Sequence, residues 1–216
     1  MNSIKGVIFD LDGTLADTMG IWDQIDIDFL SKRGISVPDD YMQEIAHLGA
    51  YKTALYTIDR FNLADTPEEL IAEWTKMALE SYKTASLKKG AREYLCALKE
   101  KGCKISIASA TDISLIEAFL ESNGIRSFID YVITVDDIGQ GKEHPDIYIK
   151  CAELMNVAIS ECLVYEDILV AIKGALSGGF KVIAMYDKYS RHDHEEIKNL
   201  ASDFIEEFPT EIKKML

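Results

Sequence analysis

The sequence predicts an α/β protein whose core is a parallel β-sheet, with a block of helices inserted after the first strand. From residue 90 onward, short apolar runs alternate with helical patterns, and this alternation is typical of parallel sheets with helices on both faces. Between residues 17 and 82, apolar residues recur only at helical spacing. A chain of 216 residues has room for one core domain that carries such an insert.

Five apolar runs carry the strand prediction. Ile4–Phe9 is short, rich in β-forming residues and followed directly by acids, which indicates a buried strand. The other expected strands are Lys104–Ser109, Tyr131–Val135, Cys162–Tyr165 and Phe180–Met185. The helices expected between them are Ala91–Lys101, Ile113–Asn123, Pro145–Met155 and Leu169–Ser177.

The inserted block is expected to hold about four helices and no strand. Trp22, Ile25 and Phe29 recur at helical spacing, and a second series of apolar residues begins at Ala54. Glycines and prolines separate the helical patterns from one another. Trp74 also stands at helical spacing with its apolar neighbours, and we expect it in the core of the block.

Charge narrows the choice of partners. The chain has 23 Lys and Arg against 37 Asp and Glu, a formal net charge of −14. Because this charge repels phosphate backbones and anionic lipid surfaces, we expect neither a nucleic-acid nor a membrane partner. A phosphorylated small molecule would be repelled too, unless a metal ion or a local cation reverses the field.

Other patterns bear on the compartment. No apolar run approaches the ~20 residues of a membrane helix, and Asp10 and Asp12 interrupt the first apolar run, so no signal peptide is expected. The four cysteines lack the spacing of a zinc site. We therefore expect reduced thiols in a cytoplasmic protein. For its assembly, we expect a monomer or a weak homodimer.

Polar residues follow four of the expected strands, where ligands bind in parallel α/β sheets. Clustered carboxylates repel one another, so such a site favours a bound cation, and oxygen ligands favour Mg²⁺. A lysine there could neutralise a phosphoryl group, and a serine could hydrogen-bond to it. Each residue alone has an ordinary structural explanation, but their joint placement favours a site. The residues are Asp10, Asp12, Gly13, Thr14, Ser109, Lys142, Glu166 and Asp167.

Four segments, in order, resemble the motifs of the haloacid dehalogenase (HAD) superfamily, in the branch of β-phosphoglucomutase-like phosphatases. They are DLDGTLADT (Asp10–Thr18), IASAT (Ile107–Thr111), GKEHPDIY (Gly141–Tyr148) and VYEDILVAIKGALSGGF (Val164–Phe180). The resemblance runs along nearly the whole chain. It implies a Rossmann-like α/β core formed by residues 1–15 and 86–216, with a helical cap domain over residues 16–85.

The resemblance also implies roles for the acidic residues. Asp10 would be the nucleophile that forms an aspartyl-phosphate, and Asp12 the general acid and base. Mg²⁺ would be held by the Asp10 carboxylate, the Asp12 main-chain carbonyl and Asp167, with Glu166 helping directly or through water. Relatives that cleave carbon–halogen bonds lack an acid at the position of Asp12, so its presence favours phosphoryl transfer.

The remaining motif residues would contact the substrate. Ser109, the Ala110 N–H and Lys142 would hold the phosphoryl oxygens, and Gly13 and Thr14 are expected beside them. Next to the lysine, Glu143 replaces a proline common in relatives. This acid either weakens the field of the lysine or points to solvent.

The cap should choose the substrate. β-Phosphoglucomutases grip a second phosphate with a Lys-Gly-x-Ser-Arg loop, but the corresponding stretch here reads EIAHLGAYKTALY (Glu44–Tyr56). Tyr51 stands in place of the arginine, and His47 stands near the lysine position. His47 is either a substrate contact or a surface histidine. Trp22 either stacks on substrate or belongs to the core of the cap.

These observations favour a Mg²⁺-dependent phosphatase that hydrolyses small phosphomonoesters, such as sugar phosphates, through an aspartyl-phosphate. The partner would be a small phosphorylated metabolite. A phosphosugar mutase of the β-phosphoglucomutase type is the first alternative, and the lost arginine counts against it. A non-catalytic metabolite-binding protein of the same fold is the second, and the paired aspartates count against that.

Overall fold

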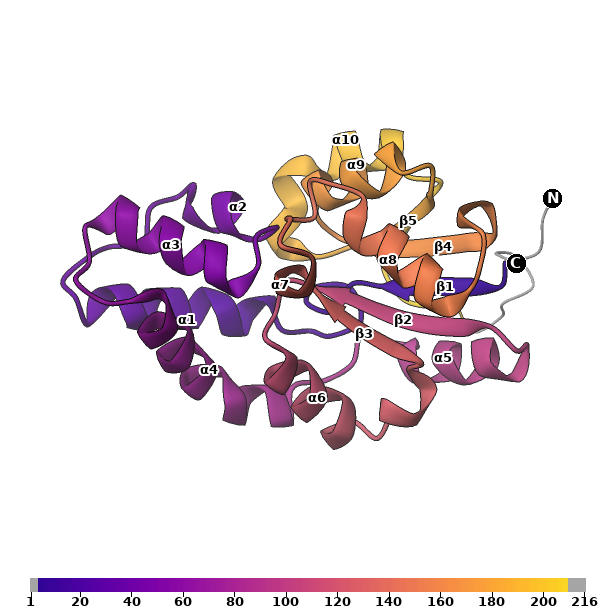
Figure 1. Ribbon diagram of the computed structural model, residues 1–216, viewed down its shortest axis with the longest axis horizontal. Coiled ribbons are helices and arrows are strands. Elements are labelled where there is room, and N and C mark those ends of the chain that lie inside the picture. Colours follow the sequence, from indigo (N-terminus) through magenta and orange to yellow (C-terminus); the bar gives the residue numbers. More distant parts are fainter. Residues whose placement is uncertain (1–3, 210–216) are drawn as a thin grey trace.

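One parallel sheet of six strands forms the centre of the described chain, in the order β3-β2-β1-β4-β5-β6 (Figure 1). The computed structural model describes residues 4–209. The strands are β1 (Gly6–Phe9), β2 (Lys104–Ser109), β3 (Tyr131–Thr134), β4 (Cys162–Glu166), β5 (Lys181–Met185) and β6 (Asp203–Ile205). The α/β fold with a parallel sheet, predicted from alternating strands and helices, is thereby confirmed.

The central strand β1 is buried on both faces. Val7 lies opposite Ile105 of β2 and Leu163 of β4, and all three side chains are fully buried. Val7 packs into one hydrophobic cluster and its neighbour Ile8 into a second, because successive side chains of a strand point to opposite faces. Helices therefore cover both faces of the sheet, as parallel strands require.

Six α-helices of the core follow the strands. They are α5 (Ala91–Glu100), α6 (Ile113–Ser122), α7 (Val135–Ile138), α8 (Asp146–Met155), α9 (Leu169–Ser177) and α10 (His194–Leu200). Buried side chains of α5 and α6 belong to the cluster of Val7, and those of α8 and α9 belong to the cluster of Ile8. Short 3₁₀ turns are η1 (Arg126–Phe128), η2 (Ile159–Glu161) and η3 (Lys188–Asp193).

Four helices between β1 and α5 form a separate group, which we call the helical block: α1 (Met19–Ser31), α2 (Tyr41–Ile45), α3 (Ala50–Phe61) and α4 (Pro67–Thr84). The Thr66 side chain and Glu69 cap the start of α4 reciprocally. Figure 1 shows the block beyond one end of the sheet. Because α1 follows soon after Phe9, the last residue of β1, the block lies at the carboxyl end of the sheet, where ligands of such folds bind.

Strand β6 and helix α7 are among the elements that were not predicted from the sequence. Strand β6 is three residues long and pairs with β5 at the edge of the sheet. Helix α7 is a single turn, and Thr134 caps it together with Asp137. Within the described residues, no helix has the length and apolar character needed to span a membrane. All four cysteines are free thiols, and three of them are buried.

Candidate active site

A tight loop after β1 places two aspartates at the carboxyl end of the sheet. The Leu11 carbonyl accepts hydrogen bonds from the N–H groups of Leu15 (2.9 Å) and Ala16 (2.8 Å), which closes the loop. Gly13 has a φ of +87°, a conformation that glycine adopts readily. A Cβ at this position would lie 2.3 Å from an Asp167 carboxylate oxygen. The glycine thus lets the loop approach the end of β4.

Three buried carboxylates meet at the ends of the adjacent strands β1 and β4. Oxygens of Asp10, Glu166 and Asp167 all lie within 4.8 Å of one another. The three residues are between 0% and 5% exposed. The Thr14 hydroxyl donates to Asp167 at 3.1 Å, so the loop after β1 also orients an acid of the neighbouring strand end.

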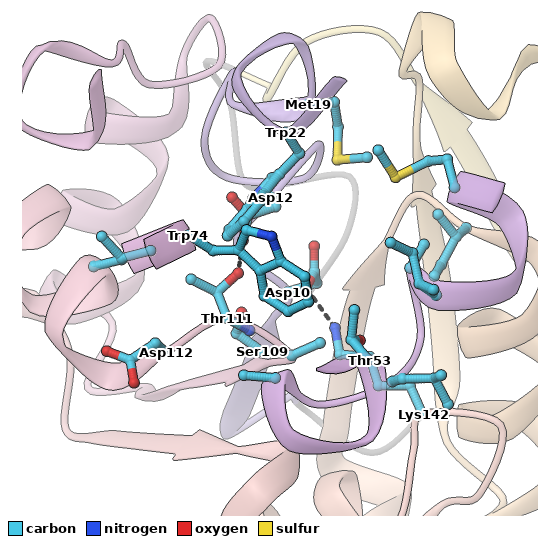
Figure 2. A pocket seen from close by; sticks show the side chains of 18 of the residues that line it. Asp10, Asp12, Met19, Trp22, Thr53, Trp74, Ser109, Thr111, Asp112 and Lys142 are labelled. Carbon is cyan, nitrogen blue, oxygen red and sulfur yellow. Dashed lines mark hydrogen bonds and ion pairs between the residues drawn. The ribbon is translucent and has the colours of Figure 1, made fainter. Parts of the chain in front are cut away.

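Lys142 is the cation of this cluster, and it is only 2% exposed. Its Nζ forms ion pairs with Asp10 Oδ1 and, at 2.6 Å, with Glu166 Oε1. The Tyr148 hydroxyl donates to the same Glu166 oxygen at 2.8 Å. The ammonium is thus held between two strand ends, and Figure 2 shows its ion pair with Asp10 near the centre of the pocket.

The cluster is short of positive charge. Burial raises the pKa of Asp10 to about 8; Lys142 opposes this effect, and the Glu166 charge adds to it. Burial also raises the pKa of Asp167 well above its usual range, and repulsion from Asp10 and Glu166 adds to the effect. Burial lowers the pKa of Lys142, but attraction by the two carboxylates outweighs burial and raises it overall. One lysine therefore does not balance three acids.

A divalent cation fits this arrangement. Asp10 Oδ2 is buried and has no hydrogen-bond partner within the described part of the chain. An unpaired buried carboxylate oxygen is costly, and a metal ion would satisfy it. Carboxylate oxygens are ligands that Mg²⁺ prefers, and two added positive charges would match the surplus of acid. The residues present can therefore hold Mg²⁺.

Asp12 is not one of the three clustered acids, and its carboxylate accepts three hydroxyl hydrogen bonds. Thr18 donates to Oδ1 at 2.5 Å, and Thr111 donates to Oδ2 at 2.7 Å. The third donor is Tyr82, at the end of α4, whose hydroxyl accepts in turn from Trp22 Nε1 at 2.6 Å. Groups from the core and from the helical block therefore fix one carboxylate together.

A pocket of about 910 Å³, partly open to solvent, lies between the sheet and the helical block. Its core side, which we call the floor, is lined by the acidic cluster, Asp12, Lys142 and three residues at the end of β2 (Ser109, Ala110 and Thr111). The Ser109 hydroxyl accepts from the Thr111 N–H at 3.1 Å.

Comparison with known proteins identifies the family. The model of the haloacid dehalogenase-like hydrolases matches residues 4–179, most of the chain. The chain belongs to this family. Hexitol phosphatase B of Escherichia coli is 26% identical over 170 residues, which cover 76% of this chain and 75% of the relative. The resemblance seen in the four motifs is thus confirmed.

Solved structures show the same fold. A variant of CbbY from Rhodobacter sphaeroides, in complex with xylulose-(1,5)bisphosphate, superposes with a TM-score of 0.81 at 20% identity, over 94% of each chain. β-Phosphoglucomutase from Clostridium difficile gives 0.80 at 18% identity, over 94% of this chain and 91% of the other. At such identities the likeness concerns the fold alone.

The structure of this HAD-like hydrolase brings most of the predicted site residues to one place. Ser109, Ala110 and Trp22 line the pocket with the acids and the lysine. Gly13 and Thr14 lie next to the Asp167 carboxylate and are not among the pocket-lining residues. Trp22 packs edge-on against Tyr82 and also lines the pocket. Its contact with substrate stays a prediction.

His47 lies at the edge of the site. Its carbonyl accepts from the Lys142 N–H at 3.0 Å, and its Nε2 is 3.7 Å from Glu143. His47 is not among the residues that line the pocket. Glu143 points toward this histidine, and the ion pairs of Lys142 run to Asp10 and Glu166 instead. The Tyr51 side chain is 46% exposed and lies outside the pocket.

Several pocket residues were not predicted as site residues. Thr111 lies in the second motif, two residues after Ser109, so its position in that motif was an available signal. Trp74 was expected in the core of the helical block; it does pack edge-on against Phe29, but it lines the pocket as well. Asp26 also lines the pocket, and nothing in the local sequence around it indicates this.

Proposed function

We propose that this protein is a Mg²⁺-dependent phosphatase that hydrolyses small phosphomonoesters through an aspartyl-phosphate on Asp10. The observation that carries the proposal is the unpartnered Asp10 Oδ2 at the floor of the pocket. This oxygen lies on the same side chain that Lys142 orients through Oδ1. A metal ion on Oδ2 would leave Oδ1, which Lys142 orients, as the oxygen that attacks phosphorus.

The acidic cluster would hold the metal. The ligands would be the carboxylates of Asp10 and Asp167 and the main-chain carbonyl of Asp12. Glu166 already accepts from Lys142, Tyr148 and the Asp167 N–H, which supports a contact through water. When bound, Mg²⁺ neutralises phosphoryl charge and offsets the repulsion between the carboxylates.

The reaction would proceed in two displacements. An Asp10 oxygen attacks phosphorus as the bond from phosphorus to the leaving oxygen breaks, and Asp12 gives that oxygen a proton. Water then attacks phosphorus, Asp12 takes a proton from it, and the bond to Asp10 breaks. Lys142 and the Ser109 hydroxyl would stabilise the negative phosphoryl oxygens in both steps.

The helical block would act as a cap domain over residues 16–85. It contributes Trp22, Trp74 and other residues to the wall of the pocket, and enclosure limits the access of bulk water and macromolecules. Among the described pocket-lining residues Lys142 is the single lysine or arginine, which favours hydrolysis over a mutase that must hold two phosphates. The kinship with hexitol phosphatase B supports a sugar or polyol phosphate as substrate.

Phosphate release tests the proposal. Wild type and Asp10→Asn are assayed on a panel of sugar phosphates and nucleotides, with Mg²⁺ and with EDTA, and thermal unfolding checks that the variant is folded. We expect release that requires both Mg²⁺ and Asp10. Equal release by wild type and a folded Asp10→Asn contradicts the mechanism. Conversion of a hexose 1-phosphate to its 6-phosphate, without release, identifies a mutase instead.

A further inference from the structure

Two polar groups of the helical block line the pocket without partners. The Asp26 side chain of α1 is 6% exposed and takes part in no hydrogen bond or ion pair between described residues. Trp74 of α4 is also 6% exposed, and its buried Nε1–H has no acceptor within that part of the chain. In Figure 2 the Trp74 indole extends into the pocket.

Of the two groups, the Trp74 Nε1–H is the one that is fully buried without a partner, and a ligand would have to supply its acceptor. Leaving a buried donor or acceptor without a partner costs about 1–3 kcal/mol. Most of the other side chains in the pocket wall are apolar and cannot form hydrogen bonds with these two groups. They are Met19, Met42, Ile45, Leu48, Ile71 and Leu115. A molecule that enters the pocket can satisfy both groups only if it carries a donor for Asp26 and an acceptor for Trp74.

The charge of the pocket restricts that molecule further. Lys142 is already paired with two carboxylates at the floor. On the walls the charged residues are Asp26 and Asp112, both acids. A second phosphate held away from the floor would face these acids without a cation, whereas a hydroxyl both donates and accepts and carries no charge.

We infer that the pocket selects the monophosphate of an uncharged, hydroxyl-bearing alcohol and excludes bisphosphates. A hydroxyl of the leaving group donates to the Asp26 carboxylate, and an oxygen of the same group accepts from Trp74 Nε1. The apolar walls pack against its carbon atoms. This inference rests on the proposed phosphatase function and adds the residues that choose the substrate. Sharing a fold with a protein that binds a bisphosphate does not weaken it, because the selecting residues belong to this chain's own helical block.

A matched substrate pair tests the inference. Glucose 6-phosphate and glucose 1,6-bisphosphate are compared by kcat/KM for phosphate release, and fructose 6-phosphate and fructose 1,6-bisphosphate are compared in the same way. A compound that is not turned over is measured as a competitive inhibitor of acetyl phosphate hydrolysis. We expect the better monophosphate to be favoured at least tenfold over its bisphosphate. Equal use of the two, or binding of neither monophosphate, overturns the inference.

Variants locate the selection. In assays at pH 8, where Asp26 is ionised, Asp26→Asn should reduce the preference for the monophosphate about tenfold, because it removes the charge that repels a second phosphate. Trp74→Phe should raise KM for the monophosphate severalfold. Asp28→Asn is the control, since Asp28 is an exposed acid on the same helix. An unchanged preference in a folded Asp26→Asn, or an equal change in Asp28→Asn, overturns the role of Asp26.

Acetyl phosphate separates this inference from the proposed function. It is too small to reach across the pocket, so its hydrolysis reports on Asp10 and the floor alone. Loss of acetyl phosphate hydrolysis in Asp10→Asn supports the phosphatase, whatever the substrate pairs show. Absence of that hydrolysis in wild type counts against the phosphatase itself.

Discussion

The Tyr82 hydroxyl of α4 donates a hydrogen bond to the Asp12 carboxylate in the loop after β1. Tyr82 is fully buried, and its own oxygen accepts from Trp22 of α1. The carboxylate proposed as general acid and base is therefore positioned partly by two helices of the helical block. A change in how the block packs would move Asp12 as well as the pocket wall.

Replacing Tyr82 should affect the chemical step. Tyr82→Phe removes the hydrogen bond and little volume, so we expect kcat to fall about tenfold with a small change in KM, as misplacement of a catalytic group predicts. Tyr94→Phe is the matched control, because Tyr94 is a buried tyrosine whose hydroxyl bonds to Tyr165 instead. Steady-state kinetics of both variants check this, and an equal fall in both would refute the positioning role.

Gly49 should be needed for the helical block to approach the core. A Cβ there would lie 2.3 Å from Asp136 Oδ1 and 2.9 Å from Val135 Cγ1. Burial raises the pKa of Asp136, and the main-chain N–H groups of Ala50 and Tyr51 at the start of α3 oppose this shift. Gly49→Ala should therefore raise KM several-fold by pushing α3 away. Adding Asp136→Ala, which removes the nearest clash, should restore part of the loss, and no recovery would count against this explanation.

Metal binding should be visible without turnover. At a hundredfold excess over its Kd, Mg²⁺ should stabilise the fold by about 2.7 kcal/mol, which raises Tm by several degrees. In Asp167→Asn the rise should largely disappear. Without metal the same variant should be more stable than wild type, because repulsion from Asp10 and Glu166 is relieved. Thermal melts with Mg²⁺ and with EDTA check both expected changes in stability. An undiminished Mg²⁺ effect in Asp167→Asn contradicts the role of Asp167 as a metal ligand.

Asp26 should make stability fall as the pH rises. Burial, with help from the Asp23 charge, raises the pKa of Asp26 from 3.8 to about 7. Between these values the folded chain holds a proton that the unfolded chain releases, so this contribution to stability is present below pH ~4 and lost by pH ~7. Asp26→Asn should therefore stabilise the protein at pH 8 and much less at pH 4.5. Thermal melts at the two pH values check this, and an effect of equal size at both would contradict it.

The core could be predicted from the sequence because its signals are local. The strands after residue 100 are short apolar runs between helical patterns, and four of the six observed α-helices of the core start or end within a residue of the prediction. Strand β6 was missed because Asp203–Ile205 has three residues and depends on pairing with β5. Helix α7 had a usable signal, since Thr134 and Asp137 form a capping box.

The floor of the site was predictable for the same reason. Asp10, Ser109 and Glu166 end or directly follow strands, and parallel topology brings strand ends together. The contribution of the helical block was not predictable. Asp26 and Trp74 line the pocket, and Tyr82 contacts Asp12, only because of the way in which the helices of the block pack. The apolar period of α4 predicted Trp74 in the core of the block, where its ring packs against Phe29. It gave no information on the Nε1 edge.

Trapping the phosphorylated enzyme tests the central claim most directly. Asp12→Asn is incubated with Mg²⁺ and acetyl phosphate, whose good leaving group needs no general acid. The reaction is quenched in acid and the peptides are weighed by mass spectrometry. We predict one added phosphoryl group on the peptide that contains Asp10, and none in the Asp10→Asn protein. Phosphate release by wild type with no phosphoryl group on that peptide, or with the group on another residue, would contradict the account.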